Sequence, residues 1–143
     1  MENCELCDVN TGEVIFGSAR WRVLLVDDVN YPGFCRVVWN AHVKEMTDLS
    51  DSERNEFMHA VWAVEQVVRD VMVPHKINLA SFGNIVPHLH WHIIPRYTDD
   101  AHFPNPVWAT ANADLLDVSA RIALLPQLRT ELLKRLNSNQ EYQ

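Results

Sequence analysis

The sequence predicts an α+β fold in which an antiparallel sheet is covered on one face by helices. Three observations predict it: β-branched and aromatic runs fill the first part of the chain, helical patterns follow, and no repeat, low-complexity tract or linker separates them. The 143 residues match the roughly 100 to 200 residues of one typical domain. We therefore expect residues 1–143 to form a single domain with one shared core.

Three short runs near the start predict strands at residues 14–16, 21–26 and 34–39. Their Val, Ile, Leu, Phe and Trp side chains suit a pleated, half-buried surface. Residues of turn type separate the runs at 17–18 and 27–33. Because strands joined by such short turns pair with their neighbours in opposite directions, we expect an antiparallel meander.

A long helix is predicted over about residues 51–72. Ser50 and Glu53 form a capping-box pattern, in which each side chain can satisfy a backbone N–H group at the helix start. Pro74 cannot continue the helix and marks its end. Apolar residues recur at helical spacing, at Phe57, Val61, Val64, Val68 and Val71. Such a stripe indicates a helix that packs one side against a sheet.

The second half of the chain predicts two more strands and a helical tail. The strands are expected at residues 77–82 and 88–94, and the tail from Asp114 to Leu136 has a helical composition. Pro126 lies inside this tail, where it forces a kink or a fresh helix start.

Charge and composition exclude several classes of protein. Twelve basic and 19 acidic residues give a net charge of −7 without any basic stripe, which argues against nucleic-acid binding. No apolar run approaches the roughly 20 residues that span a membrane. The first residues lack the basic and apolar regions of a secretory signal, and three cysteines cannot pair completely. We therefore expect a cytoplasmic protein without a nucleic-acid or membrane partner.

The segment between Pro87 and Pro95 carries the chemistry of this chain. If it is one short strand, His88, His90 and His92 alternate onto one face. Such a face can be merely solvated, or it can bind a metal ion. Three-histidine ligation from the strand alone is disfavoured, because the first and third histidines lie about 13 Å apart. Adjacent histidines, about 6.6 Å apart, can instead hold an anionic group, with one ring attacking and the next donating.

The same segment resembles a known family. Residues 88–94 match His-φ-His-φ-His-φ-φ, where φ is hydrophobic, the signature of the histidine triad (HIT) family of nucleotide hydrolases and transferases. Residues 33–42 resemble the family's Gly-His-x-Leu-Val-Ile-Pro-Lys-x-His segment, and residues 83–87 its Gly-Gln-Ser/Thr-Val-x approach to the triad. Residues 4–7, Cys-Glu-Leu-Cys, resemble the opening of many members. The resemblance covers about residues 4–108.

The resemblance implies a HIT-like fold, a five-stranded antiparallel sheet with helices packed on it, in a homodimer. The domain would then divide into a core of about residues 4–108 and a C-terminal helical extension of about residues 112–137. The implied function is hydrolysis at the α-phosphorus of nucleoside phosphoanhydrides, such as diadenosine polyphosphates, or of adenosine phosphoramidates. The alternative is a nucleotide-binding regulatory module with weak catalysis. The implied partner is a small nucleotide.

The resemblance also assigns catalytic roles. His90 would be the nucleophile that forms a nucleotidyl-histidine intermediate, and this chemistry requires no cofactor. A neutral imidazole attacks well near neutral pH when its other nitrogen donates to a fixed acceptor. His92 would donate to a non-bridging phosphate oxygen, while His88 and His42 would line or support the site.

Substrate contacts follow from the same motifs. Asn78 and Asn84 would seat the phosphate with their amides, close to Gly83 upstream of the triad. Asp27 would bind the ribose hydroxyls, with Asp28 as its rival, although an Asp-Asp pair is also ordinary turn composition. A departure from the family pattern is Ile85, which stands where many members place a Ser or Thr hydroxyl.

A structural metal site is the remaining question. Cys4 and Cys7 supply two ligands of a tetrahedral zinc site, and the resemblance points to His42 and His88 as the other two. A reduced, metal-free Cys-x-x-Cys turn is the alternative. The third cysteine, Cys35, is expected to be a small core residue.

Arg96 and Trp108, which follow the triad in the chain, each have a functional interpretation and an ordinary one. Arg96 could attract a polyphosphate, although an arginine at a strand end is usually solvated. Trp108 could border a base or a dimer partner's pocket, but we favour a hydrophobic anchor for the C-terminal segment.

Overall fold

The computed structural model describes residues 4–8, 12–112 and 116–140. Five strands form one sheet in the order β1-β2-β3-β5-β4, and all neighbouring strands are antiparallel. The elements are α1 (Glu5–Asp8), β1 (Glu13–Gly17), β2 (Trp21–Leu25), β3 (Cys35–Trp39), η1 (Met46–Asp48), α2 (Asp51–Met72), β4 (Lys76–Ala80), β5 (His90–Arg96), α3 (Ser119–Ile122) and α4 (Leu125–Gln140). The predicted α+β fold with a five-stranded antiparallel sheet is confirmed.

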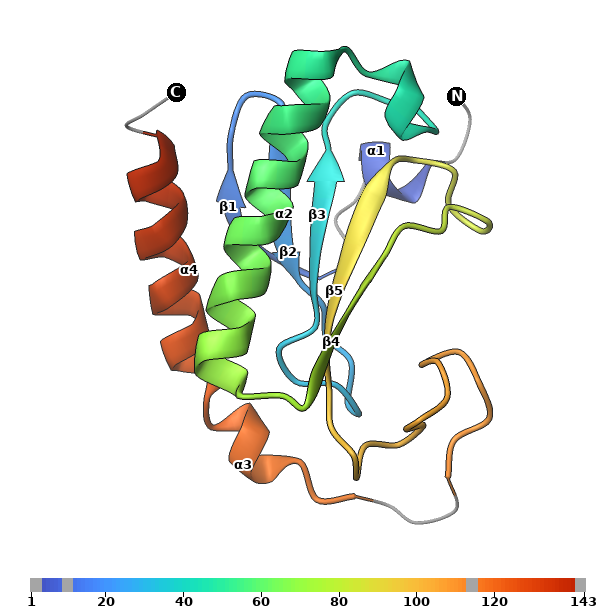
Figure 1. Cartoon of the computed structure of the whole chain (residues 1–143), viewed down its shortest axis with the longest axis vertical. Helices are drawn as coiled ribbons and strands as arrows, with labels where there is room; N and C mark the ends of the chain where they lie inside the picture. The colour runs from blue at the N-terminus through green and yellow to red at the C-terminus, as the bar shows by residue number, and fades with distance from the viewer. Residues whose placement is uncertain (1–3, 9–11, 113–115, 141–143) are drawn as a thin grey trace.

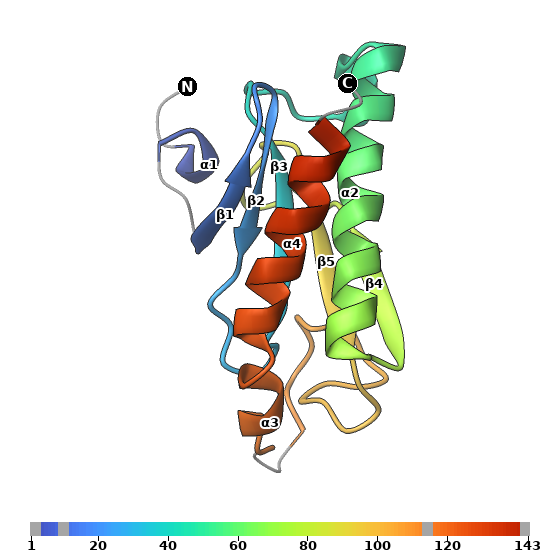
Figure 2. The same cartoon turned by 90° about the vertical axis from the view of Figure 1, so that its left-hand side faces the viewer.

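The layers place one face of the sheet under helices and leave the other largely open. The long helices α2 and α4 lie together on one face, whereas the short α1 lies on the opposite face (Figures 1 and 2). The sequence did not predict α1 or the short 3₁₀ helix η1. Both are too short to show a hydrophobic period. The homodimer implied by the resemblance stays a prediction.

Helix α2 begins and ends where the sequence predicts. The Glu53 backbone N–H donates to the Ser50 hydroxyl at 3.2 Å, and the Ser50 N–H donates to the Glu53 carboxylate at 2.8 Å. Val73 follows in a left-handed conformation with φ 48° and ends the helix just before Pro74. The predicted apolar stripe is buried in the main core against the sheet. This helix therefore packs over β3 and β5.

The C-terminal tail forms two helices instead of one. The predicted start at Asp114 lies outside the described residues. Pro126 lies in the first turn of α4, where its missing N–H group leaves no helical hydrogen bond unmade. Leu128, Leu132 and Leu136 are fully buried in the main core. The fresh-start alternative for Pro126 is thus confirmed, and α4 completes the helical layer beside α2.

Strand β5 starts two residues later than predicted. We expected a strand over residues 88–94, but the backbone N–H groups of His88 and Leu89 donate to loops, although the Leu89 carbonyl still accepts from the Trp39 N–H of β3 at 3.2 Å. The His88 N–H donates to the Val86 carbonyl and the Leu89 N–H to the Val43 carbonyl, each at 2.8 Å. His90 is the first residue of the ladder. His88 therefore does not alternate with the other two histidines as one regular strand would require.

Pro95 lies inside β5 and not beyond it. It is paired with Ile77 of β4, while the pairing of β5 with β3 reaches only as far as Ile93. Pro95 thus lies in the part of β5 that pairs with β4 and no longer with β3, where a residue without an N–H group is tolerated. None of the described helices is long and apolar enough to cross a membrane.

Candidate functional site

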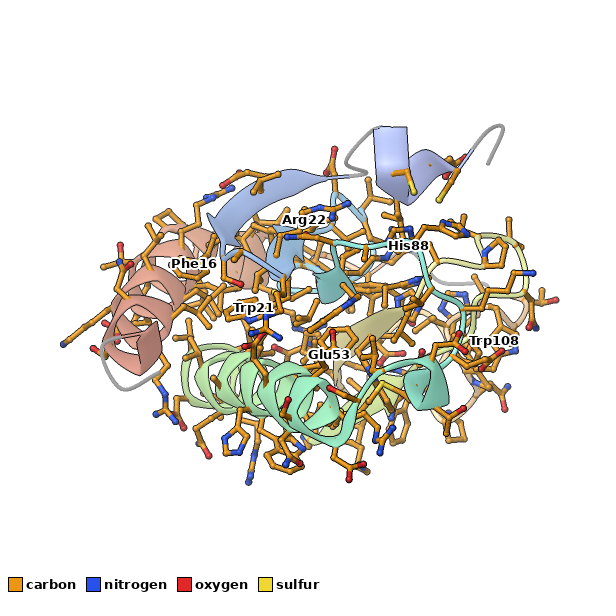
Figure 3. The ribbon with its side chains drawn as sticks, turned by 90° about the horizontal axis from the view of Figure 1, so that it is seen from above. Phe16, Trp21, Arg22, Glu53, His88 and Trp108 are labelled. Atoms are coloured by element: carbon orange, nitrogen blue, oxygen red, sulfur yellow. The ribbon has the colours of Figure 1, made fainter. Side chains whose placement is uncertain are left out.

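Alternation along β3 and β5 separates core residues from site residues. Val37 and Ile93 face the main core beneath the long helices. Arg36 and His92, which are direct cross-strand partners, line a pocket on the opposite face. Seen from above, α1 lies across the sheet from α2, and His88 lies on the side of α1 (Figure 3). The open face of the sheet therefore carries the candidate site.

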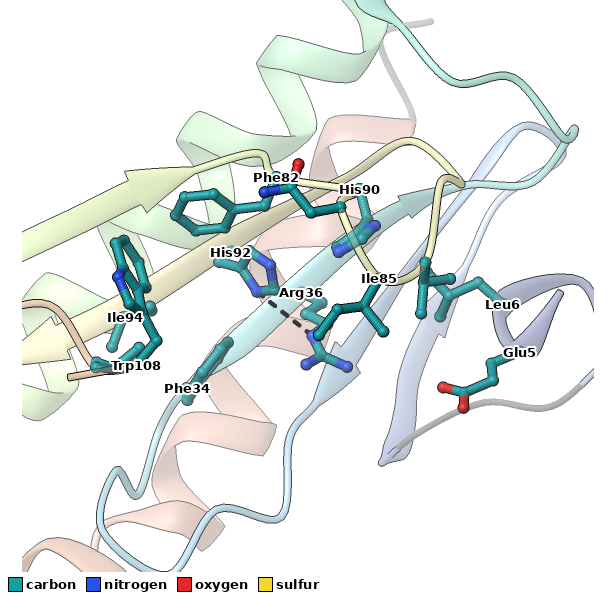
Figure 4. A pocket seen from close by; sticks show the side chains of 14 residues that line it. Glu5, Leu6, Phe34, Arg36, Phe82, Ile85, His90, His92, Ile94 and Trp108 are labelled. Carbon is teal, nitrogen blue, oxygen red and sulfur yellow. Dashed lines mark hydrogen bonds between the residues drawn. The ribbon is translucent and has the colours of Figure 1, made fainter. Parts of the chain in front are cut away.

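The pocket has a volume of about 630 Å³, which suits a small organic ligand. Its walls come from five parts of the chain: α1, β3, the loop after β4, β5 and the segment after β5 (Figure 4). The lining residues are Glu5, Leu6, Phe34, Arg36, Phe82, Gly83, Asn84, Ile85, Val86, His90, His92, Ile94, Val107 and Trp108. Imidazole, guanidinium and amide groups thus lie among mostly apolar walls.

His90 is held in one hydrogen-bonded orientation. Its Nδ1 lies 2.5 Å from the backbone carbonyl oxygen of His88. A carbonyl oxygen only accepts, so Nδ1 carries the proton and Nε2 keeps its lone pair. Burial lowers the pKa of His90, the hydrogen bond to His88 opposes that effect, and the charge of Arg36 lowers the pKa further. The ring is therefore neutral near neutral pH.

His92 lies directly beside His90, with the two ring centroids 4.8 Å apart. Its Nδ1 accepts a hydrogen bond from Nε of Arg36 at 3.4 Å. Phe34 and Phe82 contact the ring, with centroids at 5.5 and 5.6 Å. Burial, followed by the charges of His90 and Arg36, lowers the pKa of His92 to about 3. This second imidazole is therefore neutral as well.

His88 belongs to a different cluster. Its Nδ1 lies 3.4 Å from the sulfur of Cys4 and of Cys7, and Nδ1 of His42 lies 3.3 Å from the Cys7 sulfur. The four ligand atoms all lie within 4.8 Å of one another. His88 Nε2 donates to the carbonyl of Trp39 at 2.6 Å, which leaves Nδ1 as the lone-pair nitrogen.

The donor set of this cluster fits zinc. Tetrahedral zinc with two thiolates and two imidazoles separates neighbouring ligand atoms by roughly 3.3 to 3.8 Å. The measured contacts between sulfur and nitrogen of 3.3 to 3.4 Å agree with that spacing. The cluster therefore gathers the four predicted residues, Cys4, Cys7, His42 and His88, into a candidate zinc site. Neither His42 nor His88 borders the pocket, so of the two roles predicted for them only support of the site agrees with this geometry.

The predicted substrate contacts divide into two groups. Gly83 and Asn84 line the pocket, and Gly83 has the left-handed φ of 78° that glycine adopts without strain. Asn78 lines an adjoining, smaller cavity of about 310 Å³, which shares Ile94, Val107 and Trp108 with the pocket, and it accepts a hydrogen bond from Arg96. Asp27 is exposed and does not border the site pocket. The side chain of Asp28 instead accepts the backbone N–H of Asn30 inside the turn.

The ordinary interpretations of Arg96 and Trp108 were wrong, while the functional alternatives stay predictions. Arg96 is only 3% exposed and is paired with Asp100, so it is not a solvated strand end. Trp108 is 66% exposed and therefore does not act as a buried anchor. It lines the pocket and contacts Phe82 edge to face, with centroids 4.7 Å apart. Ile85, in place of the family hydroxyl, is 94% exposed at the pocket edge.

Sequence reasoning missed Arg36 and the aromatic residues Phe34 and Phe82. One signal was present, because a lone arginine interrupts the apolar run of β3 and alternation places it opposite the core face. Glu5 and Leu6 were also missed. They reach the pocket from α1, which no local pattern predicts.

Comparisons with known proteins agree with the geometry. A sequence model of the HIT domain matches residues 8–99. The chain is 35% identical over 78 residues to an AP-4-A phosphorylase of Mycobacterium tuberculosis, in a match that covers 50% of this chain and 40% of that protein. It therefore spans less than half of the mycobacterial protein's length. It is 28% identical over 136 residues to the Protein hit of Bacillus subtilis, covering 85% of this chain and 93% of that protein.

Solved structures show the same fold. A histidine triad protein of Bradyrhizobium japonicum superposes with a TM-score of 0.72 at 28% identity, over 87% of this chain and 90% of that one. A HIT family member from Bacillus subtilis superposes with a TM-score of 0.62 at 25% identity, over 94% and 97%. The domain match covers well over half of the chain. The chain therefore belongs to the HIT domain family.

Proposed function

We propose that this protein hydrolyses nucleotides at the α-phosphorus, through a nucleotidyl intermediate on His90. Its substrates would be nucleoside phosphoanhydrides such as diadenosine polyphosphates, or adenosine phosphoramidates. The observation that carries the proposal is the hydrogen bond between Nδ1 of His90 and the His88 carbonyl. It leaves Nε2 as a neutral nucleophile on the wall of a pocket of ligand size.

The proposed reaction has two displacements. First, the Nε2 lone pair forms a bond to the α-phosphorus, and the bond from phosphorus to the leaving oxygen or nitrogen breaks with its electron pair going to the leaving group. The imidazole becomes cationic, and its Nδ1–H bond to the His88 carbonyl strengthens. Water then attacks the same phosphorus and the bond to Nε2 breaks, with its electron pair returning to the imidazole. The proton that this water releases to solvent balances the one that the leaving group takes up from solvent in the first step. Neutral His90 and a nucleoside monophosphate result.

Neighbouring groups would stabilise the phosphate during both steps. The second imidazole, His92, would donate from Nε2 to a non-bridging oxygen, since its Nδ1 already accepts from Arg36. The amide of Asn84 and the backbone at Gly83 line the same pocket and would bind other phosphate oxygens. Phe82 and Trp108 form an exposed aromatic corner on which a nucleobase could stack. The chemistry proposed for these residues uses no metal ion.

Catalysis is tested by assaying adenosine phosphoramidate, diadenosine triphosphate and diadenosine tetraphosphate with the wild type and with His90→Ala. We expect turnover by the wild type and a loss on the order of 10³-fold or more in the variant. The control is His59→Ala, on the exposed side of α2, which should keep full activity. Turnover by His90→Ala at the wild-type rate would contradict the nucleophile. Nucleotide binding without turnover by either protein would favour the binding-module alternative.

A structural role for zinc is a second part of the proposal, carried by the four-residue cluster. We infer that Cys4, Cys7, His42 and His88 hold one Zn²⁺ that pins α1 to the loops before α2 and β5. By fixing His88, the ion would also fix the carbonyl that orients His90.

The zinc site is tested by metal analysis of the purified protein. We expect about one zinc per chain, lost in Cys7→Ser and kept in Cys35→Ala, whose sulfur lies in the main core. Retention of zinc by Cys7→Ser would contradict the ligand assignment. Wild-type hydrolysis that persists after chelation, with the fold monitored by circular dichroism, would separate the ion from the chemistry.

A further inference from the structure

Arg36 places a cation beside the catalytic histidines. It lies on β3 directly opposite His92 of β5, and it is half-buried in the pocket wall. Its guanidinium carbon lies 5.7 Å from the centroid of the Phe34 ring, so the charged group rests on an aromatic face. The family segment that residues 33–42 resemble has leucine at this position. Arg36 is therefore a feature of this chain to be explained by its own contacts.

The contact between Arg36 and His92 defines where the imidazole proton lies. Figure 4 shows the guanidinium reaching the His92 ring from below, and its Nε is 3.4 Å from Nδ1. A guanidinium has no lone pair to offer and only donates, so Nδ1 of His92 must be the acceptor. A neutral imidazole with an accepting Nδ1 carries its proton on Nε2. Arg36 thus selects one tautomer of the neighbouring ring.

We propose that Arg36 is a positioning residue, which holds His92 as the Nε2–H tautomer so that this N–H donates to the substrate phosphate. This inference rests on the proposed function for the identity of the acceptor. The guanidinium acts through the ring in two ways. It occupies Nδ1 and so stops the ring from turning that edge toward the substrate, and its positive charge polarises the imidazole and strengthens the Nε2–H donor.

The surroundings of the ring support a fixed orientation. Phe34 packs edge to face against the His92 ring at an interplanar angle of 75°, and Phe82 packs at 42°. With two aromatic side chains against the ring and Arg36 on Nδ1, little freedom remains about its side-chain torsions. A donor that is already oriented does not have to reorganise during the reaction, which is the condition for effective electrostatic stabilisation.

Nitrogen-15 NMR of the imidazole groups tests the tautomer directly, and it does not depend on turnover. In the wild type at neutral pH we expect His92 to show a protonated Nε2 and an accepting Nδ1. In Arg36→Met, which keeps the length of the side chain but has no donor, the two nitrogen signals should move toward averaged values. Arg36→Lys, which keeps a donor, should return part of the wild-type pattern. A protonated Nδ1 in the wild type, or signals unchanged in Arg36→Met, would overturn the inference.

Steady-state kinetics tests the consequence for the reaction. We expect Arg36→Met to lower kcat by about tenfold with a smaller change in KM, which is less than the 10²- to 10³-fold loss typical when a whole donor is removed. Arg36→Lys should recover part of kcat. The control is Arg20→Met, whose exposed side chain lies near Glu56 of α2. A normal kcat in Arg36→Met despite an altered His92 tautomer would contradict the role in catalysis. An inactive wild type with the expected His92 signals would instead refute the proposed function.

Discussion

Two arginines on neighbouring strands differ in what their charge does. Arg96, at the end of β5, donates from Nε and Nη2 to the two oxygens of Asp100 at 2.7 and 3.1 Å, and from Nη1 to Asn78 at 2.8 Å. Arg36, on β3, donates to the neutral imidazole of His92 in the wall of an open pocket. The Arg96 guanidinium is held by side chains of the fold, whereas the Arg36 guanidinium lines the candidate site.

The pKa directions of the two groups express the same difference. Burial lowers the pKa of both guanidinium groups. For Arg96, the hydrogen bonds and the charge of Asp100 outweigh burial, and the pKa is raised. For Arg36, the charges of Glu5 and Asp28 offset burial only in part, and the pKa is lowered. The comparison teaches that the Asp100 carboxylate holds the Arg96 guanidinium within the fold, whereas Arg36 presents a donor to an imidazole of the pocket wall.

The carboxylate of Asp100 ties down the segment that follows β5. It accepts the backbone N–H groups of Tyr97, His102 and Phe103 at 2.7 to 3.0 Å, in addition to the guanidinium of Arg96. This segment leads to Trp108 in the pocket wall. The ion pair of Arg96 and Asp100 therefore supports one side of the candidate site without contacting it.

Removing the Asp100 charge should have the largest effect on stability. In Asp100→Asn the guanidinium of Arg96 stays buried without its counter-charge, and we expect a loss of about 3 to 5 kcal/mol in the free energy of unfolding. The control is Asp99→Asn, whose exposed carboxylate pairs with Arg121 and should contribute at most about 1 kcal/mol. Urea unfolding followed by tryptophan fluorescence measures both. Equal losses of unfolding free energy in Asp100→Asn and Asp99→Asn would show that the buried ion pair of Arg96 and Asp100 contributes no more than an exposed one.

At acid pH, the wild type and Asp100→Asn should approach the same free energy of unfolding. Burial alone would raise the pKa of Asp100, but the hydrogen bonds from Arg96 and from backbone N–H groups hold it below the ordinary aspartate value. A depressed folded-state pKa stabilises the protein fully above the unfolded-state value of about 4, and the contribution is lost as the pH falls below it.

Urea unfolding of both proteins across pH 7 to pH 2 measures this linkage. The gap in unfolding free energy between them should stay constant down to about pH 5 and narrow below about pH 4. A gap that stays constant into the acid range would show that the Asp100 charge does not carry the stabilisation.

Asn78 should behave as part of the structural arginine and not as a substrate contact. Its carbonyl oxygen accepts from Nη1 of Arg96, and its strand position is opposite Ile94 of β5. Asn78→Ala should therefore cost about 1.5 to 3 kcal/mol, the usual contribution of a hydrogen bond to a charged group. KM for the nucleotide should change less than about twofold. A large rise in KM with normal stability would restore the substrate role that the sequence suggested.

The smallest effect on stability is expected at the other arginine. Arg36→Met keeps the length of the side chain and removes a charge that burial already disfavours, so the free energy of unfolding should change by less than about 1 kcal/mol. Thermal unfolding compared with that of Arg96→Met measures the contrast, because the latter variant leaves Asp100 buried without its partner. A destabilisation of Arg36→Met as large as that of Arg96→Met would assign both arginines to the fold.

Much of the fold was predictable, because it depends on local periods. Helix α2 follows from a capping box, a stripe at helical spacing and a proline, all within 25 residues of sequence. The meander from β1 to β3 follows from apolar runs and turn residues. Along β5, the alternation of His90 and His92 toward one face was also predictable, since every strand repeats after two residues.

The sequence by itself therefore determined the α+β class, the long helix and its buried face, and the family signature that contains His90 and His92. Only the tertiary structure decided the partners of the remaining residues. His88 turns away to Cys4, 84 positions earlier in the chain, and Asn78 binds Arg96, 18 positions later. Arg36 meets His92 across 56 positions. The physical reason is that backbone geometry sets a local period, whereas strand register and loop closure set which distant side chains meet.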